Sequence, residues 1–351
     1  MTLTEMIKSP GEWMRGTGPE AEIVISSRVR LARNIRGYRF ITKMDTAERT
    51  ACEAYIQQQL AAAKAAQPGL YLQVHKLDAM DRKFLVERHL ISKEHEDAQH
   101  HRGVAVSEDE AVAIMVNEED HIRLQVLQSG FQLQEAWRTC NRIDDALEQR
   151  LDYAFSPQLG YLTACPTNVG TGMRVSVMLH LPALVITRHI EKVFQAVAKM
   201  NLAVRGLYGE GTEASGHFYQ ISNQVTLGRT EDDIVKNVEQ VIPSIVGYEH
   251  RARQTLLAND RQRLEDRVWR AYGALKYAQL LPSDEAMMML SWLRMGVHLG
   301  LLKDLPMRTI NELFVFTQPA HLQKMTGRVL EPTERDTRRA EFVRAKLNGK
   351  A

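Results

Sequence analysis

The sequence predicts an α+β fold in which an antiparallel sheet with flanking helices is followed by a smaller helical domain. Three features support this fold class: closely spaced strand-like runs between residues 70 and 128, a second group of such runs beside glycine-rich loops, and long helical periodicity from about residue 254. The 351 residues are enough for two ordinary domains. We therefore place the larger domain at residues 1–253 and the helical domain at residues 254–351.

The elements of the larger domain follow from the spacing of its apolar residues. A helix is expected over residues 46–66, because Asp45 and Glu48 can form a capping box ahead of an alanine-rich segment. Polar turns separate the strands that come next, which favours antiparallel pairing. These strands are expected at residues 70–75, 104–107, 111–117 and 122–128. Further helices are expected near residues 131–155 and 188–200.

Composition and termini exclude several classes of protein. The N-terminal segment lacks the basic start and apolar run of a signal peptide, and the longest apolar stretch is broken by His180 and Pro182, so no membrane segment is expected. A net charge of +2 gives no reason to expect direct binding to nucleic acid. The three cysteines are too few and too far apart for a disulfide framework, which favours a cytoplasmic location; they are Cys52, Cys140 and Cys165.

Several standard motifs are absent from the chain. There is no GxxxxGK[ST] phosphate loop, no GxGxxG after a strand, and no HRD or DFG motif. The histidines at 95, 100 and 101 do not have the HExxH spacing that places two ligands on one helical face. We expect this segment to be a solvated loop, and no metal site is predicted.

Arginines near strand ends and glycine-rich turns are the most informative feature of the chain. They stand in the segments SSRVRLARN (residues 26–34), NEEDHIR (117–123), CPTNVGTGMR (165–174) and RGLYGE (205–210). Any one of these arginines alone is more typical of a surface ion pair. Together they can replace a phosphate loop, because the guanidinium group presents a planar fork of donors that matches phosphate oxygens.

The four segments together resemble the phosphagen (guanidino) kinase family, over most of residues 20–250. The resemblance implies that the arginines bind the phosphates of ATP, that Glu119 and Glu210 hold a guanidinium substrate, and that Cys165 contacts it. The implied phosphate ligands are Arg28, Arg30, Arg123, Arg174 and Arg205. The resemblance also suggests His89 as a nucleotide contact. The other implied nucleotide-binding residues are Ser26, Ser27, Val29, Val175, Ser176, Val177, Met178, Gly206, Leu207, Tyr208 and Gly209.

The chemistry of phosphoryl transfer explains these residue types independently. A guanidinium is a poor nucleophile at neutral pH, because its pKa is above about 12 and its electrons are delocalised. Two carboxylates can orient it and accept its proton. Arginines and Mg²⁺ can then stabilise the charge that spreads over the transferred group. ATP and Mg²⁺ are therefore the expected cofactors.

Two departures from the metabolic enzymes indicate which subfamily the chain resembles. Only 25 residues precede Ser26, where the metabolic kinases carry a helical domain that encloses a small substrate, and a C-terminal domain is added. In both respects the chain resembles bacterial protein-arginine kinases, as it does in SNQVTLG (residues 222–228) and LEDRVWRAYG (264–273).

That resemblance implies phosphorylation of arginine in proteins, in stress response and protein quality control, with an activator protein and a ClpC–ClpP-type protease as partners. A metabolic arginine kinase that acts on free arginine, or a non-catalytic adaptor with a kinase fold, are the alternatives.

The C-terminal domain carries a second candidate site, and its helix is expected to begin at Pro332 and Thr333. The segment RDTRRA resembles the RDxxRA motif with which protein-arginine kinases bind phosphoarginine outside the active site. Its residues are Arg335, Asp336, Thr337, Arg338, Arg339 and Ala340. From charge alone, a solvated basic helix would be preferred. A homodimer is expected, and the apolar residues Met287, Leu290 and Leu293 could form core or a dimer interface, with core preferred.

Overall fold

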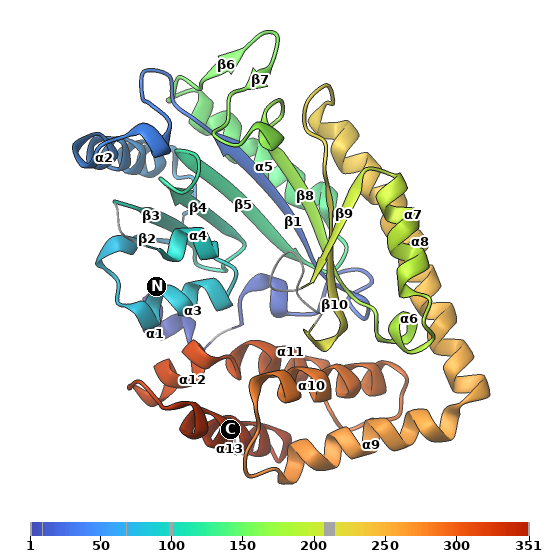
Figure 1. Ribbon diagram of the computed structural model, residues 1–351. Coiled ribbons are helices and arrows are strands. Elements are labelled where there is room, and N and C mark those ends of the chain that lie inside the picture. Colours follow the sequence, from blue (N-terminus) through green and yellow to red (C-terminus); the bar gives the residue numbers. More distant parts are fainter. Residues whose placement is uncertain (1, 9, 68, 98–100, 207–214, 350–351) are drawn as a thin grey trace.

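The computed structural model describes residues 2–8, 10–67, 69–97, 101–206 and 215–349, and within them eight strands form one antiparallel sheet (Figure 1). The strand order is β2-β3-β4-β5-β1-β8-β10-β9. The strands are β1 (Val24–Arg33), β2 (Gly69–Gln73), β3 (Gly103–Ser107), β4 (Val112–Val116), β5 (Ile122–Ser129), β8 (Met173–His180), β9 (Leu202–Gly206) and β10 (Phe218–Asn223). A small hairpin of β6 (Phe155–Ser156) and β7 (Gly160–Tyr161) lies apart from this sheet. The α+β class with an antiparallel sheet is confirmed.

One face of the sheet is apolar and covered by helices. Side chains alternate along a strand, so Val29 and Leu31 of β1 face the same side as Val175 and Val177 of β8. All four are fully buried in one hydrophobic cluster with residues of the covering helices. The main covering helices are α2 (Thr46–Ala63), α5 (Leu133–Glu148), α6 (Pro182–Ile186), α7 (Ile190–Lys199) and α8 (Glu231–Asn259).

Most of the boundaries expected from the sequence are confirmed. The four strands between residues 70 and 128 begin and end within two residues of the predicted positions. The Asp45 carboxylate caps α2 by accepting a hydrogen bond from the Glu48 amide at 2.9 Å. The helix expected to reach residue 155 ends at Glu148 instead, because the chain turns back there and Tyr153 forms a β-bridge with Ile35.

The opposite face of the sheet is only partly covered. Helix α3 (Ala79–Glu87) packs on β3 and β4 through Phe84 and Leu85, which share a cluster with Val104 and Met115. The short helix α4 (Lys93–Glu96) follows α3. Beside these helices, the same face of β1, β5 and β8 carries polar side chains.

Five helices form a layer at one end of the sheet (Figure 1). They are α9 (Arg261–Tyr277), α10 (Ser283–His298), α11 (Met307–Phe316), α12 (Pro319–Thr326) and α13 (Pro332–Leu347). This layer has its own hydrophobic cluster, which includes Leu290 and Leu293, so these two residues belong to the core of the chain as preferred from the sequence. None of the described helices is long and apolar enough to cross a membrane.

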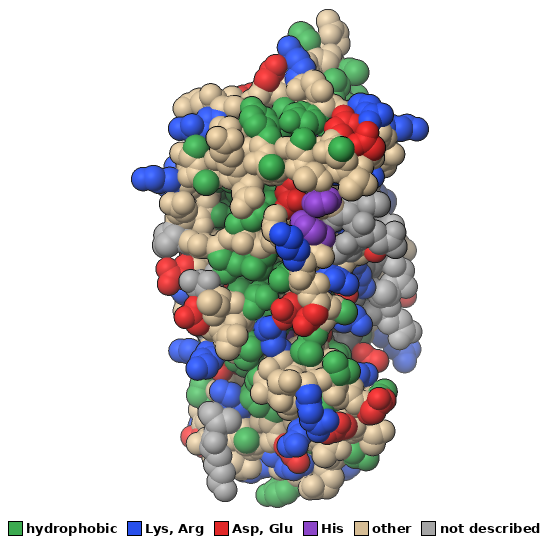
Figure 2. All heavy atoms as spheres, turned by 90° about the vertical axis from the view of Figure 1, so that its left-hand side faces the viewer, with side chains coloured by type: hydrophobic (Ala, Val, Ile, Leu, Met, Phe, Trp, Pro, Cys, Tyr) green, Lys and Arg blue, Asp and Glu red, His purple; other side chains and the backbone are tan. Residues whose placement is uncertain are grey.

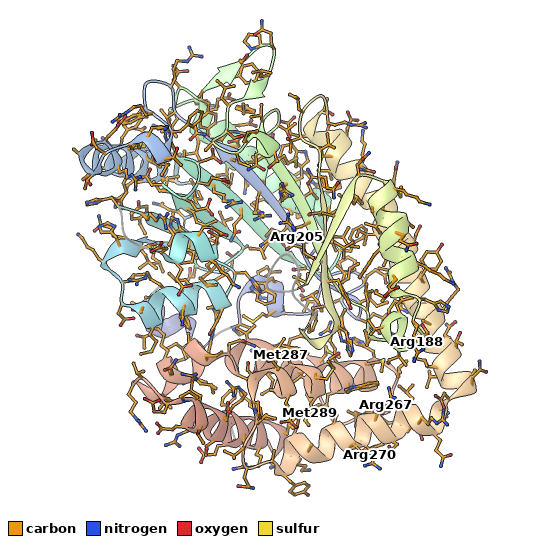
Figure 3. The ribbon with its side chains drawn as sticks, in the orientation of Figure 1. Arg188, Arg205, Arg267, Arg270, Met287 and Met289 are labelled. Carbon is orange, nitrogen blue, oxygen red and sulfur yellow. The ribbon has the colours of Figure 1, made fainter. Side chains whose placement is uncertain are left out.

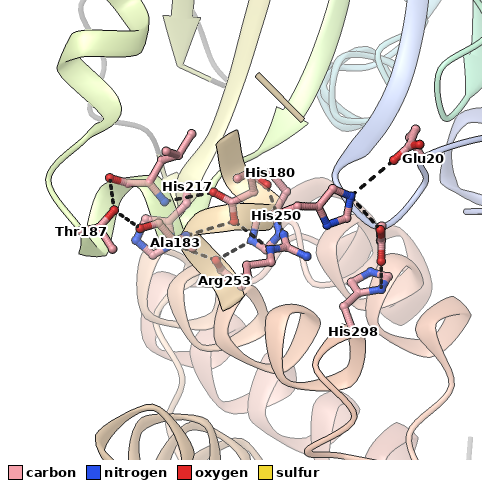
Figure 4. A network of polar contacts seen from close by, with 12 residues as sticks. Glu20, His180, Ala183, Thr187, His217, His250, Arg253 and His298 are labelled. Atoms are coloured by element: carbon pink, nitrogen blue, oxygen red, sulfur yellow. Dashed lines mark hydrogen bonds and ion pairs between the residues drawn. The ribbon is translucent and has the colours of Figure 1, made fainter. Parts of the chain in front are cut away.

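Helix α8 joins the two parts of the chain without a break. It contains residues 253 and 254, so the boundary placed there falls within a helix. The buried Arg253 donates to Glu249 Oε1 at 2.8 Å, and the Glu249 carboxylate accepts from the backbone amides of Ala183 and Leu184 (Figure 4). From the C-terminal layer, Ser291 Oγ lies 2.8 Å from ring nitrogens of both His180 and His217. The interface between the two parts is therefore polar as well as apolar.

Candidate active site

Arginines from four strands of the sheet share its uncovered face. Arg28 and Arg30 are two residues apart in β1, so they point to the same side. Arg30 pairs with Arg174 in β8, and Ala32 of β1 pairs with Arg123 in β5. Arg205 of β9 pairs with Gln220, whose side chain accepts a hydrogen bond from Arg28 Nη2 at 2.6 Å. All five arginines singled out in the sequence therefore lie on what we call the arginine face.

Among the described residues, several cations of the arginine face lie close enough to repel one another. Burial, followed by the charges of Arg123 and Arg174, lowers the pKa of Arg28 to about 10. Burial and the charge of Arg28 likewise lower the pKa of Arg30 well below its usual value. Arg30 Nε is buried and has no hydrogen-bond partner among the described residues. Such a donor, surrounded by like charges, is suited to a multiply charged anion.

Four of the predicted nucleotide-binding residues point to the other side of the sheet. Val29, Val175 and Val177 are fully buried in the apolar cluster, and the Ser27 hydroxyl donates to the Gly130 carbonyl at 2.8 Å. Alternation along the strand therefore keeps their side chains away from any ligand on the arginine face. Side chains of Ser26, Ser176 and Met178 line the cavity on that face.

A cavity of about 270 Å³ lies between the arginine face and the C-terminal layer. Arg28, Arg30 and Arg205 line its polar part. Its other lining residues include Trp13, Met287 of α10, Phe314 of α11 and Gln318. Figure 3 shows Arg205 on the sheet and Met287 on the helix beneath it. The sequence did not predict that α10 and α11 line the cavity, because no motif links these helices to the arginines.

His89 and Trp13 form one side of this cavity. His89 has a left-handed backbone conformation (φ 58°), and its carbonyl accepts from Gln125 Nε2 at 2.6 Å. Its ring meets the Trp13 ring edge-on, with centroids 5.0 Å apart. Burial and the charge of Arg28 lower the pKa of His89 to about 4, so its imidazole is neutral at pH 7. Trp13 Nε1 is a buried donor with no partner among the described residues.

The turn between β4 and β5 presents one carboxylate outward and holds its neighbour inward. Asn117 begins it in a left-handed conformation (φ 59°), which asparagine tolerates better than most residues. Glu118 is buried and bonded to Arg123 and to the Ser92 hydroxyl. Burial alone would raise the pKa of Glu118, but these partners hold it at about 2. Glu119 is exposed, and partial desolvation together with the charge of Asp120 raises its pKa.

Asp120 connects this turn to the loop that carries Cys165. Asp120 Oδ1 accepts from Asn34 Nδ2 at 2.6 Å and from the Ala164 amide at 2.7 Å. Cys165 is half-buried, with its Sγ 3.0 Å from the Thr167 hydroxyl. Asp120 therefore links the turn that carries Glu119 to the loop that carries Cys165 through a hydrogen bond. Sequence reasoning missed Glu118 and Asp120, although the acidic run around Glu119 was visible.

The second predicted substrate-binding carboxylate, Glu210, lies outside the described residues. So do Leu207, Tyr208 and Gly209. Gly206, the last residue of β9, lines the cavity next to Arg205.

The RDTRRA segment lies in α13, where its residues divide into two groups. Arg335, Asp336 and Thr337 are half-buried, and the exposed Arg338 pairs with Glu341 at 2.8 Å. Arg339 is buried and donates to the carbonyls of Thr317 and Leu281 and to Asp336 Oδ1. Ala340 is fully buried in the cluster of the C-terminal layer. Arg339 and Ala340 therefore hold the helix in place, and the first four residues are the accessible ones.

Two protein-family models match successive parts of the chain. Residues 51–252 match the family described as "ATP:guanido phosphotransferase, C-terminal catalytic domain", and residues 261–351 match "Protein-arginine kinase McsB C-terminal domain". A protein-arginine kinase from Symbiobacterium thermophilum is 50% identical over 97% of this chain and 98% of that protein. The protein-arginine kinase of Bacillus subtilis is 44% identical over 99% of this chain and 96% of that protein.

Solved structures with the same fold include two other guanidino kinases. A duplicated taurocyamine kinase from Schistosoma mansoni, with bound transition-state-analogue components, has a TM-score of 0.61 at 30% identity. That match covers 67% of this chain, which spans about a third (34%) of the duplicated protein. A lombricine kinase has a TM-score of 0.58 at 28% identity, over 70% of this chain and 69% of that one.

The fold and the arginine face define a phosphotransferase of the guanidino kinase class. The C-terminal layer and the full-length relatives narrow this class further. The chain belongs to the protein-arginine kinase family.

Proposed function

We propose that the chain transfers the γ-phosphoryl group of MgATP to guanidinium groups of arginine residues in proteins. The observation that carries this proposal is the arginine face, where the buried Arg30 Nε has no hydrogen-bond partner within the described part of the chain and the pKa values of Arg28 and Arg30 are lowered. A triphosphate supplies the negative charge and the acceptors that these groups lack.

The cavity fits the two ends of a nucleotide. Arg28, Arg30 and Arg205 would hold the phosphates, with Arg123 and Arg174 on the same face beside them. The base would lie toward the part of the cavity lined by Trp13, Met178, Met287 and Phe314, with the neutral His89 as a polar contact. Mg²⁺ bound to the triphosphate would reduce its charge and help to orient the γ-phosphoryl group.

Glu119 is the candidate general base in this reaction. Its raised pKa makes it a better proton acceptor than an ordinary carboxylate, while the pKa of about 2 keeps Glu118 ionised as the partner of Arg123. We assign Glu210 as the second carboxylate and Cys165 as a substrate contact. As transfer proceeds, the guanidinium nitrogen would bond to the γ-phosphorus, ADP would leave toward the arginines, and a carboxylate would take the proton.

Arginine within a protein, rather than free arginine, is the proposed substrate. Glu119 is exposed and Cys165 is half-buried, so a guanidinium on a protein segment can approach from outside. The full-length relatives are named protein-arginine kinases, which supports the same choice.

One assay separates this proposal from the two alternatives. The chain is incubated with MgATP and either free arginine or an unfolded arginine-rich protein, and acid-labile phosphate is measured on each. We expect phosphorylation of the protein and little of the free amino acid. A metabolic arginine kinase would phosphorylate the free amino acid, and an adaptor would phosphorylate neither.

We also propose that the accessible part of the RDTRRA segment binds phosphoarginine as an allosteric ligand. Arg335 and Arg338 would take the phosphoryl group and Asp336 the guanidinium, because opposite charges then match the two ends of the ligand. In calorimetry, Arg335→Ala should weaken phosphoarginine binding, and basal kinase activity should persist. Unchanged affinity would contradict this second site.

The cellular partners of the enzyme would be an activator protein and a ClpC–ClpP-type protease that degrades the phosphorylated proteins. The enzyme itself would be a cytoplasmic homodimer.

A further inference from the structure

Two imidazoles and a carboxylate converge at the edge of the sheet remote from the nucleotide cavity. Glu53 comes from α2, His75 from the 3-10 turn η3 (Val74–Lys76) after β2, and His101 from the segment before β3. One possible ligand atom from each lies within 4.8 Å of the other two. Figure 2 views the side of the molecule that carries α2 and β2, and shows histidine side chains grouped beside an acidic one.

The distances suit a tetrahedral metal ion. His101 Nδ1 lies 3.6 Å from Glu53 Oε2, and the rings of His75 and His101 have centroids 4.5 Å apart. Two ligands on a tetrahedral zinc ion with bonds of about 2.0–2.1 Å are separated by about 3.4 Å. The separation between Glu53 and His101 is therefore close to the one that a shared ion needs, and a ligand atom of His75 lies within 4.8 Å of both.

Hydrogen bonds from outside the cluster orient two of its three members. Tyr71 donates its phenolic hydrogen to Glu53 Oε1 at 3.3 Å, which leaves Oε2 directed at His101. His75 Nδ1 lies 3.2 Å from the Arg102 carbonyl oxygen. Nδ1 also lies 3.3 Å from the Arg102 amide nitrogen, and in the tautomer that donates Nδ1–H to the carbonyl the lone pair of Nε2 is available, as is common for metal-binding histidines.

Among the described residues, the carboxylate of Glu53 has no permanent countercharge. Glu53 is 2% exposed, and across the part of the chain that the structure describes no lysine or arginine forms an ion pair with it. Its ionic neighbour is His101, which is charged only when protonated. A buried carboxylate is costly without a cation, and a divalent ion held with two neutral imidazoles would supply one.

We propose that Glu53, His75 and His101 bind a divalent transition-metal ion of the zinc type, with water as the fourth ligand. A set of two imidazoles and one carboxylate binds Zn²⁺ in preference to Mg²⁺ or Ca²⁺. The sequence did not reveal this site, because the three ligands come from separate elements and follow no motif spacing.

The ion would brace the turn that carries Glu119. Asn117 Nδ2 donates to the carbonyl of Arg49, one turn before Glu53 in α2, at 2.9 Å. It also donates to the carbonyl of His101 at 3.1 Å. A metal that joins Glu53 to His101 would therefore fix the two backbone segments that position Asn117. The role is structural and separate from the Mg²⁺ that accompanies ATP.

The test measures metal binding by the untagged full-length chain, without nucleotide or arginine substrate. The chain is stripped with a chelator and titrated with Zn²⁺, and with Co²⁺ as a spectroscopic probe of tetrahedral coordination. We expect one ion per chain, the visible absorption of tetrahedral Co²⁺, and a higher unfolding temperature with Zn²⁺. Glu53→Gln and His101→Ala should each weaken binding by about 10- to 100-fold or more.

A matched control comes from Glu20, Glu22 and His250, of which the first is exposed and the other two half-buried, and whose side chains also approach one another. His250→Ala should leave the Co²⁺ spectrum and the thermal shift unchanged. No stoichiometric binding by the wild-type chain would overturn the proposal. Equal binding by wild type and His101→Ala, or loss of the signal in His250→Ala alone, would overturn it as well.

Discussion

Asp120 Oδ1 accepts a hydrogen bond from the Ala164 amide at 2.7 Å, and this contact links the turn that carries Glu119 to the loop that carries Cys165. The same oxygen accepts from Asn34 Nδ2 at 2.6 Å. Asp120 is buried, and Asn34 Nδ2 also donates to the Leu162 carbonyl at 3.0 Å. We infer that Asp120 positions the two substrate-facing groups without touching the substrate itself.

Replacing Asp120 by alanine should therefore separate substrate positioning from nucleotide binding. The change removes the acceptor of the Ala164 amide and one of the two acceptors of Asn34 Nδ2, which we expect to lower the free energy of unfolding by about 1–3 kcal/mol. The KM for the protein substrate should rise or kcat should fall, while ATP affinity measured by calorimetry stays near the wild-type value. Asp120→Asn retains an acceptor oxygen and should recover part of the activity. A loss confined to ATP affinity would contradict this role.

Glu119→Gln tests the proposed general base. The amide keeps the shape of the side chain but cannot accept the proton, so kcat should fall by about 10²- to 10⁴-fold. Folding and ATP binding should be unaffected, because Glu119 is exposed. Glu108→Gln, another exposed glutamate in a turn, serves as the control and should retain activity. Turnover of Glu119→Gln near that of the control would rule out the mechanism.

The ion pair between Glu118 and Arg123 predicts a pH dependence of stability. The pKa of Glu118 is depressed to about 2 from an ordinary value near 4.5, so its stabilising contribution is fully present above about pH 5. That contribution should be lost as the pH falls through the window from about 5 to 2. Glu118→Gln should be less stable at neutral pH and should show a flatter profile in this window. Identical profiles for wild type and variant in denaturant titrations would contradict the assignment.

Arg30→Met tests whether Arg30 serves to bind an anion and not to stabilise the nucleotide-free fold. Removing this buried cation relieves its repulsion with Arg28, so we expect the nucleotide-free protein to be as stable as wild type or more stable. ATP should then no longer raise the unfolding temperature. Arg36→Met, at an exposed position, should leave the ATP response intact. A destabilised nucleotide-free protein that still binds ATP would show that Arg30 is structural.

Trp13→Phe tests the nucleotide-binding role of a residue that no motif indicated. Phenylalanine retains an aromatic ring against His89 but lacks the buried Nε1 donor, which has no partner within the described residues. If ATP accepts from this donor, its Kd should rise about 2- to 10-fold, corresponding to one neutral hydrogen bond. The KM for the protein substrate should not change. An ATP Kd equal to that of wild type would place the base elsewhere in the cavity.

Local sequence determined the elements and the chemical types of the candidate site. Alternating apolar residues located the strands, Asp45 marked the start of α2, and the arginine-bearing segments identified the strands that carry the arginine face. These features depend on neighbours within a few residues, so a pattern along the chain is sufficient to find them. Alternation also explains why Val29 and Val175 cannot direct side chains to the arginine face, although a motif includes them.

Tertiary structure alone decided which distant residues share a surface. The sequence did not reveal that Met287 and Phe314 of the C-terminal layer would line the cavity beside the arginine face, or that Glu118 would pair with Arg123 while Glu119 points outward. It also did not indicate that Glu53 would meet His75 and His101. Each of these contacts depends on how whole helices and strands pack, because burial and charge compensation act between surfaces and leave no fixed spacing in the chain.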